Sequence, residues 1–527
     1  MNHVWKKSLI VTVVCLLLST AAACTKTETA EPKSSKPAEG TKAGNQEAPV
    51  KIVSISAYPQ YVKNNATEKH VHDIIQEKTG VDVQRVFSTL EGRAAYNQKV
   101  NLMLSSGEQL DIIPFETIDD AVQLYKNGAI IPINDLLDKY GSNLKKNIPP
   151  QAWAEVTVGG KIIGIPSAYQ NSAPYITQIR TDWLKNVNLP MPATLEDFEK
   201  VMDAFLNNDP DRNGKKDTYP LNAGSGAVPL KELELGFAPY FLPQAMEWWQ
   251  DGQGKLLPPE MHPGYKAMLA KLVEWNKKGY IWPDMLLSTG SKRLEAIAQN
   301  KIGTVSGWWT SPVYGGTEIL VKTIPDANYE PFLLQGGPGV NKLQTVPGAQ
   351  QVTVVTKQSK NPEAAIKFLD FHASREGYDM VYYGLDGESY KKMPDGTLEF
   401  IGGDKYDQGK ANYYVLYWMY YMDWKDGGFS PWATSSWLHI AFNSLLKKVN
   451  NLPRFDYTDK GVIYQKAEWK SFAKLNDVET YLTEQKTKVF TGETPLSDWD
   501  TIMQKWQEIG GSQMIEDKNA QFKAAKK

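Results

Sequence analysis

The sequence predicts an α/β fold, because strand-like segments with alternating apolar and polar residues are separated by helical segments. Residues 51–56 alternate like a strand, a helical segment follows around residues 72–75, and residues 81–86 alternate again. A helix predicted over 96–104 then leads into a strand predicted over 111–115. Strands that alternate with helices along the chain are typical of a parallel sheet.

The remaining chain is predicted to be richer in helix. Thr194 and Asp197 have the spacing of a capping box, and they precede a run of apolar residues that fall on one helical face. Beyond Gly264 helical patterns dominate. The other predicted elements are helices over 121–125 and 133–140, strands over 302–306 and 351–356, and a last helix over 495–508 capped by Ser497.

The first residues have the pattern of a secretory signal. Lys6 and Lys7 precede the apolar run 9–18, which is too short to span a bilayer. The segment ends in three alanines and Cys24, which resembles the lipobox of bacterial lipoproteins. We expect residues 1–23 to be removed, Cys24 to be diacylated, and polar residues 24–49 to form a disordered tether. The protein would then sit on the outer face of the cell membrane, on its extracellular or periplasmic side.

An ordinary signal peptidase offers an alternative, since Ala21 and Ala23 also suit its cleavage site and would release the protein. Lipidation is favoured because the chain has only 2 cysteines, and Cys15 leaves with the signal. The mature part then has no thiol besides Cys24, which excludes disulfides, thiol catalysis and thiolate metal sites.

The charge of the chain excludes one class of partner. The 527 residues have a formal net charge of −2, with both signs interspersed, and this predicts no binding of nucleic acid. The length suffices for two or more domains, each with its own core. We expect a monomer.

A segment after the capped helix has the spacing of a calcium-binding loop. Asp209, Asp211, Asn213 and Asp217 occupy positions one, three, five and nine, Gly214 occupies position six, and Lys215 offers its carbonyl oxygen at position seven. Calcium prefers six to eight oxygen ligands, and this alternation directs side-chain oxygens toward one centre. Position twelve, where such loops carry a bidentate Glu, is Pro220. We expect a structural calcium ion, and the alternative is a solvated turn between helices.

The sequence offers no catalytic motif that we can assign. The 6 histidines are scattered, and no zinc-protease, serine-hydrolase or phosphate-binding pattern occurs. A pair of carboxylates for glycoside hydrolysis is not marked by sequence, so a secreted glycan-degrading enzyme stays open as an alternative. A peptide-binding lipoprotein is a second alternative.

Aromatic residues follow several predicted strands, at the positions where ligands bind in open α/β sheets. Sugars offer apolar C–H faces for stacking and hydroxyls for amides and carboxylates, so these residue types favour an oligosaccharide ligand. The candidate ligand-binding residues are Tyr58, Phe115, Glu116, Tyr169, Gln170, Trp308, Trp309, Trp424 and Trp432.

Several motifs together resemble one family, the large extracellular solute-binding lipoproteins (family 1) of ATP-binding-cassette importers for oligosaccharides. The resemblance extends over nearly all of the mature chain. Its motifs are 98–107 leading to 111–113, 127–133, 160–166, 179–184 with 192–194, 383–390 and 491–496.

The resemblance implies a hinged, two-lobed fold like that of periplasmic binding proteins of type II. The expected lobes are residues 50–171 with 309–352, and 172–308 with 353–527. It implies a binding protein, and no enzyme, that captures an oligosaccharide between the lobes and delivers it to a membrane permease with a partner ATPase. Some members of the family hold calcium in the loop 209–217.

Overall fold

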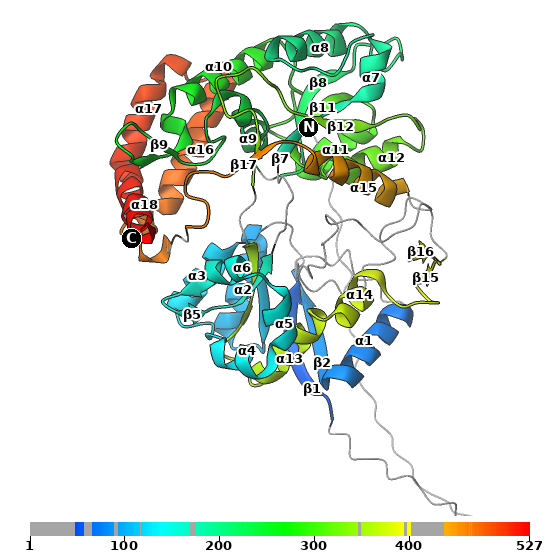
Figure 1. Cartoon of the computed structure of the whole chain (residues 1–527), viewed down its shortest axis with the longest axis vertical. Helices are drawn as coiled ribbons and strands as arrows, with labels where there is room; N and C mark the ends of the chain where they lie inside the picture. Colours follow the sequence, from blue (N-terminus) through cyan, green and yellow to red (C-terminus); the bar gives the residue numbers. More distant parts are fainter. Residues whose placement is uncertain are drawn as a thin grey trace, which may run out of the picture. The chain divides into compact units, whose positions relative to one another are not determined.

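The computed structural model describes residues 48–56, 66–88, 93–115, 117–168, 175–226, 228–345, 349–394, 398–401, 437–462, 464 and 466–526. The chain divides into two units, Met1–Ala48 and Pro49–Lys527. The first strand begins at Val50, as predicted. Within Pro49–Lys527 the described residues build two larger β-sheets with helices packed on them, which is a two-lobed α/β fold (Figure 1).

The first sheet is mixed. Its strands lie in the order β2 (Val81–Phe87), β1 (Val50–Ser56), β3 (Ile112–Phe115), β14 (Ala349–Val355) and β6 (Ile165–Ala168). β1, β2 and β3 are parallel, whereas β14 runs antiparallel to both of its neighbours. The predicted parallel pairing is therefore confirmed for the first three strands.

Both faces of the first sheet are buried. Ile52 and Ile112 belong to a core on one face, and Ile55 and Ile113 belong to a core on the other, as the alternation along a strand requires. The helices of this part are α1 (Ala66–Thr79), α2 (Arg93–Ser106), α3 (Ile118–Lys126), α4 (Asn134–Tyr140), α5 (Ser142–Asn147), α6 (Pro150–Glu155), α13 (Pro362–His372) and α14 (Arg375–Tyr383).

The second sheet has the strand order β12 (Tyr329–Phe332), β7 (Tyr175–Arg180), β11 (Ile302–Trp308) and β8 (Tyr219–Ala223). β8 and β11 are parallel, and β7 is antiparallel to β11 and β12. The helices that follow these strands and the C-terminal helices are α7 (Thr181–Asn186), α8 (Leu195–Asn207), α9 (Pro229–Phe241), α10 (Pro263–Lys277), α11 (Gly290–Ala298), α12 (Glu318–Leu320), α15 (Trp437–Asn450), α16 (Leu475–Thr491), α17 (Trp499–Trp506) and α18 (Ser512–Ala525).

Short elements complete the described chain. They are the strand pairs β4 (Thr157–Val158) with β5 (Lys161–Ile162), β9 (Trp249–Gln250) with β10 (Leu256–Leu257), β13 (Leu343–Gln344) with β17 (Arg454–Phe455), and β15 (Tyr390–Lys392) with β16 (Leu398–Phe400), and the turns η2 (Pro259–Met261), η3 (Val313–Thr317), η5 (Lys466–Glu468), η6 (Phe472–Lys474), η7 (Leu496–Asp498) and η8 (Gln507–Gly511).

The capping box predicted for helix α8 is confirmed. The hydroxyl of Thr194 accepts a hydrogen bond from the backbone N–H of Asp197, and the Asp197 carboxylate accepts one from the backbone N–H of Thr194. The prediction that Ser497 caps the last predicted helix is wrong. Helix α17 begins after Asp498, which makes no side-chain cap, and the Ser497 hydroxyl donates to the Asp498 carboxylate at 3.1 Å.

Strand pairing differs from the lobe ranges expected from the sequence. β12 lies within the range 309–352 expected for the first lobe, but it pairs with β7 of the second sheet. α13 lies within 353–527, expected for the second lobe, but it packs on α1 and α4 beside the first sheet. The strand at 329–332 has no clear pattern in the sequence, so the second crossing between sheets falls later than expected, between β12 and β14.

Candidate functional site

The strand ends of the second sheet bring two aromatic rings together. β7 begins with Tyr175 and β11 ends with Trp308, and these two residues are register partners. Their rings are 5.7 Å apart and nearly perpendicular, an arrangement that places the edge of one ring against the face of the other. The Trp308 side chain is half-buried. The predicted candidate Trp308 therefore lies at a carboxyl strand end beside Tyr175, a residue that the sequence did not indicate.

A buried carboxylate lies next to this ring pair. Glu232, on the first turn of α9, is 3% exposed, and its carboxylate accepts hydrogen bonds from the backbone N–H groups of Gly226, at 3.1 Å, and Trp308. Burial raises the pKa of Glu232 to about 7, although those two bonds and the Arg293 guanidinium oppose the rise. Burial, and then the nearby charge of Glu232, raise the pKa of Tyr175.

Arg293 completes this group. It projects from α11, is 1% exposed, and donates hydrogen bonds to the carbonyl oxygens of Gly224, Gly226 and Ser288. The sequence shows the glycines of this turn and the proline that begins α9. It does not show that the side chains of Glu232 and Arg293 both bind the backbone of the turn. That contact depends on how α9 and α11 pack on the sheet.

The other predicted ligand-binding residues have different surroundings or fall outside the described residues. Phe115 is 4% exposed and packs in the core against Tyr96, with ring centroids 6.4 Å apart. Trp309 is 6% exposed, and its carbonyl oxygen accepts a hydrogen bond from Gln178. Both side chains therefore serve packing in this structure. The candidates outside the described residues are Tyr58, Glu116, Tyr169, Gln170, Trp424 and Trp432.

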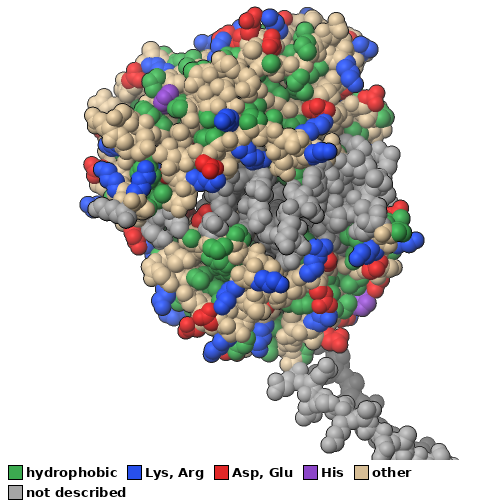
Figure 2. All heavy atoms as spheres, in the orientation of Figure 1, with side chains coloured by type: hydrophobic (Ala, Val, Ile, Leu, Met, Phe, Trp, Pro, Cys, Tyr) green, Lys and Arg blue, Asp and Glu red, His purple; other side chains and the backbone are tan. Residues whose placement is uncertain are grey.

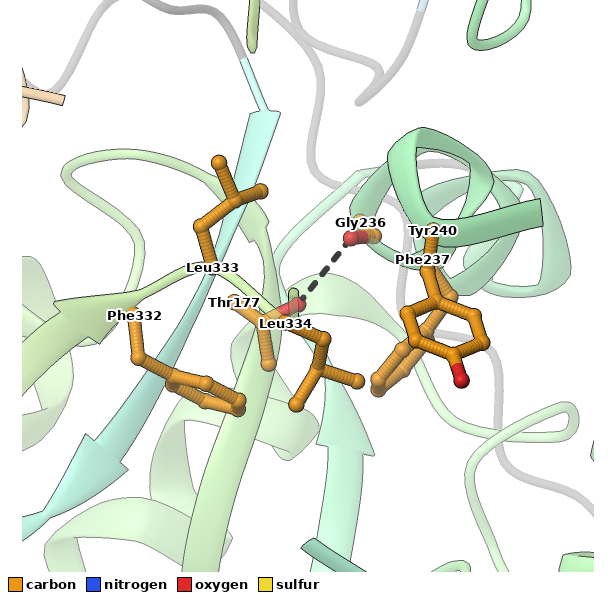
Figure 3. A pocket seen from close by; sticks show the side chains of 7 residues that line it. All are labelled: Thr177, Gly236, Phe237, Tyr240, Phe332, Leu333 and Leu334. Carbon is orange, nitrogen blue, oxygen red and sulfur yellow. Dashed lines mark hydrogen bonds between the residues drawn. The ribbon is translucent and has the colours of Figure 1, made fainter. Parts of the chain in front are cut away.

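A small cavity lies between α9 and the ends of β7 and β12 (Figure 3). It is lined by Thr177, Gly236, Phe237, Tyr240, Phe332, Leu333 and Leu334. The Thr177 hydroxyl donates to the carbonyl oxygen of Gly236 across it, at 3.4 Å. The accessible space is ≈ 10 Å³, which is room for about one water molecule, so this cavity holds no sugar ring.

The acidic loop (residues 209–217) folds around its own carboxylates. Both oxygens of Asp209 accept backbone N–H groups at 3.0 Å, from Asn213 and Gly214. The side-chain amide of Asn213 donates to Asp211 at 2.7 Å and to Asp217 at 3.0 Å. Gly214 has φ +75°, a left-handed conformation that glycine adopts without strain. The predicted ligands thus converge on one loop.

The charge state of this loop fits a cation. Burial, the adjacent Asp209 carboxylate, to which protonated Asp211 could donate, and the charge of Asp217 raise the pKa of Asp211 to about 6. The Oδ1 atom of Asp211 is buried and accepts no hydrogen bond. An ion placed at that oxygen would satisfy it and offset the repulsion among the carboxylates. Among the described residues no group of three or more His, Cys, Asp or Glu side chains is arranged so that it could hold a metal ion, so the carboxylates of the loop would have to move to bind one.

Two positions beyond the loop cannot serve as ligands. Thr218 is buried, and its hydroxyl donates to the carbonyl oxygen of Phe205 at 2.8 Å. Pro220 is buried in β8. The bidentate position of an EF-hand is therefore occupied by a core residue of the sheet.

Comparison with known proteins decides the family. Residues 71–387 match the family described as bacterial extracellular solute-binding protein, which is more than half of the chain. The chain belongs to this family. Its members are binding proteins and not enzymes. No described helix of this solute-binding protein is both long and apolar enough to cross a membrane.

Relatives and solved structures agree with this assignment. The solute-binding protein is 24% identical over 549 residues, the whole of both chains, to the polygalacturonan/rhamnogalacturonan-binding protein YtcQ of Bacillus subtilis. Its fold matches the alginate-binding protein AlgQ2 without calcium ion, with TM-score 0.69, 21% identity, and 92% and 100% of the two chains covered. The Streptococcus pneumoniae substrate-binding protein FusA in complex with kestose matches with TM-score 0.70, 21% identity, and 90% and 99% covered. These folds confirm the two-lobed prediction.

Proposed function

We propose that this solute-binding protein captures an oligosaccharide and delivers it to the membrane permease of an ATP-binding-cassette importer. The observation that supports this best is the Tyr175–Trp308 pair at the strand ends of the second sheet, beside the buried carboxylate of Glu232. Aromatic faces stack on the C–H faces of sugars, and a few fixed polar groups select their hydroxyls. The relatives YtcQ and FusA, named for polygalacturonan, rhamnogalacturonan and fructooligosaccharide, support the same ligand class.

The mechanism would be a shift of populations. A ligand that contacts both lobes stabilises the closed form relative to the open form by its difference in affinity for the two. The closed form then docks on the permease, and a partner ATPase supplies the energy for transport. The chain contributes binding and orientation of the sugar, and no covalent step.

The second part of the proposal is a structural calcium ion in the acidic loop. Asp209, Asp211, Asn213 and Asp217 would bind it through side-chain oxygens, and Lys215 through its carbonyl oxygen. The buried, unpartnered oxygen of Asp211 supports this assignment. Two solved structures with this fold are described in terms of calcium or an EF-hand, namely AlgQ2 without calcium ion and an EF-hand mutant of FusA.

The third part is anchoring at the outer face of the membrane through diacylated Cys24. This residue lies outside the described residues, in the unit Met1–Ala48. A relative named lipoprotein LipO, 24% identical over 462 residues, supports the assignment. Mass spectrometry of the membrane fraction tests it: a diacylglyceryl group on Cys24 is expected, and an amino terminus at Cys24 without lipid contradicts it.

Thermal unfolding tests the binding function directly. The protein lacking residues 1–24 is heated with 1 mM calcium and one sugar at a time, from trigalacturonate, alginate trisaccharide, kestose and maltotriose, and each sugar is recovered afterwards. At about 100 times the dissociation constant a ligand stabilises the folded state by about 2.7 kcal/mol. We expect one sugar class to raise Tm and to be recovered intact. Cleaved sugar would support the glycan-degrading alternative, and a Tm raised only by peptides would support the peptide-binding alternative.

A further inference from the structure

The turn at residues 224–226 is held from two sides by buried charged side chains. Arg293 binds the carbonyl oxygens of Gly224 and Gly226, and Glu232 binds the N–H of Gly226. These two side chains are 1% and 3% exposed, and they come from different helices, α11 and α9. Two carbonyl oxygens and one N–H of this turn are therefore held by side chains that are themselves buried.

Three glycines give the Glu232 carboxylate its space. A Cβ atom added at Gly226 would lie 2.8 Å from the carboxyl carbon of Glu232, and one at Gly224 or Gly307 would lie 3.2 Å from its Oε1 atom. These separations are shorter than ordinary van der Waals contact, so a larger residue at any of the three positions would displace the carboxylate or the turn. The ends of β8 and β11 are thus shaped around this one side chain.

Glu232 also fixes the end of strand β11. Its carboxylate accepts the N–H of Trp308, and its backbone carbonyl accepts the hydroxyl of Ser306 at 2.8 Å. The backbone of Trp308 is held by this hydrogen bond, and its ring contacts the ring of Tyr175. The same carboxylate therefore contacts both the turn and the strand end that carries the aromatic pair.

We propose that Glu232 is a positioning residue of the oligosaccharide site, which holds Trp308 and the turn 224–226 in the arrangement that binds sugar. The proposal rests on the proposed function. The ionised carboxylate accepts stronger hydrogen bonds from the two N–H groups than the neutral acid does. The binding arrangement is consequently favoured when Glu232 is ionised.

The surroundings of Glu232 lead its carboxyl group to change charge near neutral pH. Arg293 faces it from α11, and Tyr175 faces it from β7. The favourable charge of Arg293 is outweighed by burial, and the pKa of Glu232 is raised to about 7. Sugar affinity should then depend on pH in the neutral range even for a ligand that has no titratable group.

Two measurements on the mature protein test the proposal. The first is hydrogen exchange of the sugar-free protein, compared between the natural protein and Glu232→Gln at one pH. We expect loss of protection at the amides of Gly226 and Trp308. The second is calorimetric titration with trigalacturonate and with kestose between pH 6 and pH 8. The natural protein should bind about ten-fold more weakly at pH 6 than at pH 8. The reason is that about a tenth of the Glu232 side chains are ionised at pH 6 and about nine-tenths at pH 8.

Matched variants separate positioning from folding. Glu232→Gln should bind more weakly at pH 8 and show no change in affinity with pH. Glu234→Gln, on the same helix, removes a buried carboxylate that pairs with Lys486 instead, and it should keep the pH dependence. Gly226→Ala places a Cβ atom 2.8 Å from the carboxyl carbon of Glu232 and forces the turn and the carboxylate apart, so it should weaken binding. Glu232 is still present to titrate in this variant, so binding should still depend on pH.

The outcomes distinguish this proposal from the proposed function. If Glu232→Gln keeps both the affinity and the pH dependence of the natural protein, the positioning role is wrong. Unchanged protection of Gly226 and Trp308 in the exchange experiment also overturns it. If neither sugar binds the natural protein while peptides do, the oligosaccharide function fails, and the exchange result still decides whether Glu232 holds the turn.

Discussion

The side-chain amide of Asn300 donates a hydrogen bond of 3.2 Å to the carboxylate of Asp211. Asn300 in turn accepts a hydrogen bond of 2.9 Å from Arg180, a fully buried residue that also pairs with Asp182 through two hydrogen bonds. The acidic loop is thereby tied to β7 and to the start of β11. Because Asn300 and Arg180 already orient the Asp211 carboxylate, this side chain would lose less conformational entropy when an ion binds.

Removal of the Asn300 amide should weaken both the loop and its affinity for calcium. Asn300 has φ +61°, so Asn300→Gly removes the amide and keeps the backbone conformation. We expect about 1 kcal/mol less stability and a several-fold higher Kd for calcium, measured by denaturant unfolding and calorimetry. Asn207→Gly would destabilise helix α8 by giving the unfolded chain more conformational freedom, so the control is Asn207→Ala, which removes an exposed hydrogen bond to Asp203 outside the loop. Equal calcium affinity in Asn300→Gly and the natural protein would contradict the role.

Calcium affinity should fall when the pH falls through about 6. Calcium binds ionised carboxylates, and the pKa of Asp211 in the metal-free loop is raised to about 6, so protons compete with the ion below that pH. Titrations at pH 5 and pH 7.5 measure the difference. Asp211→Asn should bind calcium weakly at both values. Lys215→Ala is the control, because only the backbone carbonyl of Lys215 is a proposed ligand. A loop that binds equally well at both pH values would rule out Asp211 as a ligand.

Glu232 should make the natural protein less stable as the pH rises from about 4.5 to about 7. Its pKa is raised in the folded state, so the folded state binds more protons than the unfolded state within that window, and stability falls with rising pH. The full difference corresponds to about 3 kcal/mol. Glu232→Gln should remove this component, which urea unfolding at pH 4.5 and pH 8 detects. A variant with the same pH dependence as the natural protein would show that Glu232 does not titrate there.

His372 should have the opposite effect. It lies at the end of α13, is 7% exposed, and burial lowers its pKa to about 4, although a hydrogen bond with the carbonyl of Phe368 opposes this. The unfolded state therefore binds the proton first, and stability is lost as the pH falls from about 6.5 to about 4, by about 3 kcal/mol. His372→Gln should reduce this loss in acid unfolding. The exposed His70 provides the control for the exchange of a histidine for Gln, and His70→Gln should retain the loss that His372→Gln reduces.

The sequence predicted much of the architecture for identifiable physical reasons. The capping box of Thr194 and Asp197 depends on residues three apart, and the alternation of residues 51–56 depends on nearest neighbours, so both are visible in a single sequence. The acidic loop is likewise local, and its side chains are linked to one another by hydrogen bonds. The prediction of calcium itself stays a prediction that the titrations above decide.

The candidate ligand site was less accessible to sequence reasoning. Trp308 follows a strand and was predicted, but Tyr175 begins a strand that runs in the opposite direction, and only the register of β7 and β11 brings the two together. Phe115 is the last residue of β3, and its side chain packs in the core. Which side of a strand end faces the ligand depends on the tertiary arrangement. Glu232 and Arg293 were missed for the same reason.

Strand β14 affects how the chain folds during synthesis. It lies between β3 and β6, which end at residues 115 and 168, but it begins only at residue 349. A nascent chain therefore exposes unpaired edges of β3 and β6 while about 180 further residues are made, and open edges are sites of aggregation. Premature completion of the first sheet is disfavoured because the strand that joins β3 to β6 is absent. Products truncated before residue 349 should therefore keep these edges unpaired and aggregate more readily than the whole chain.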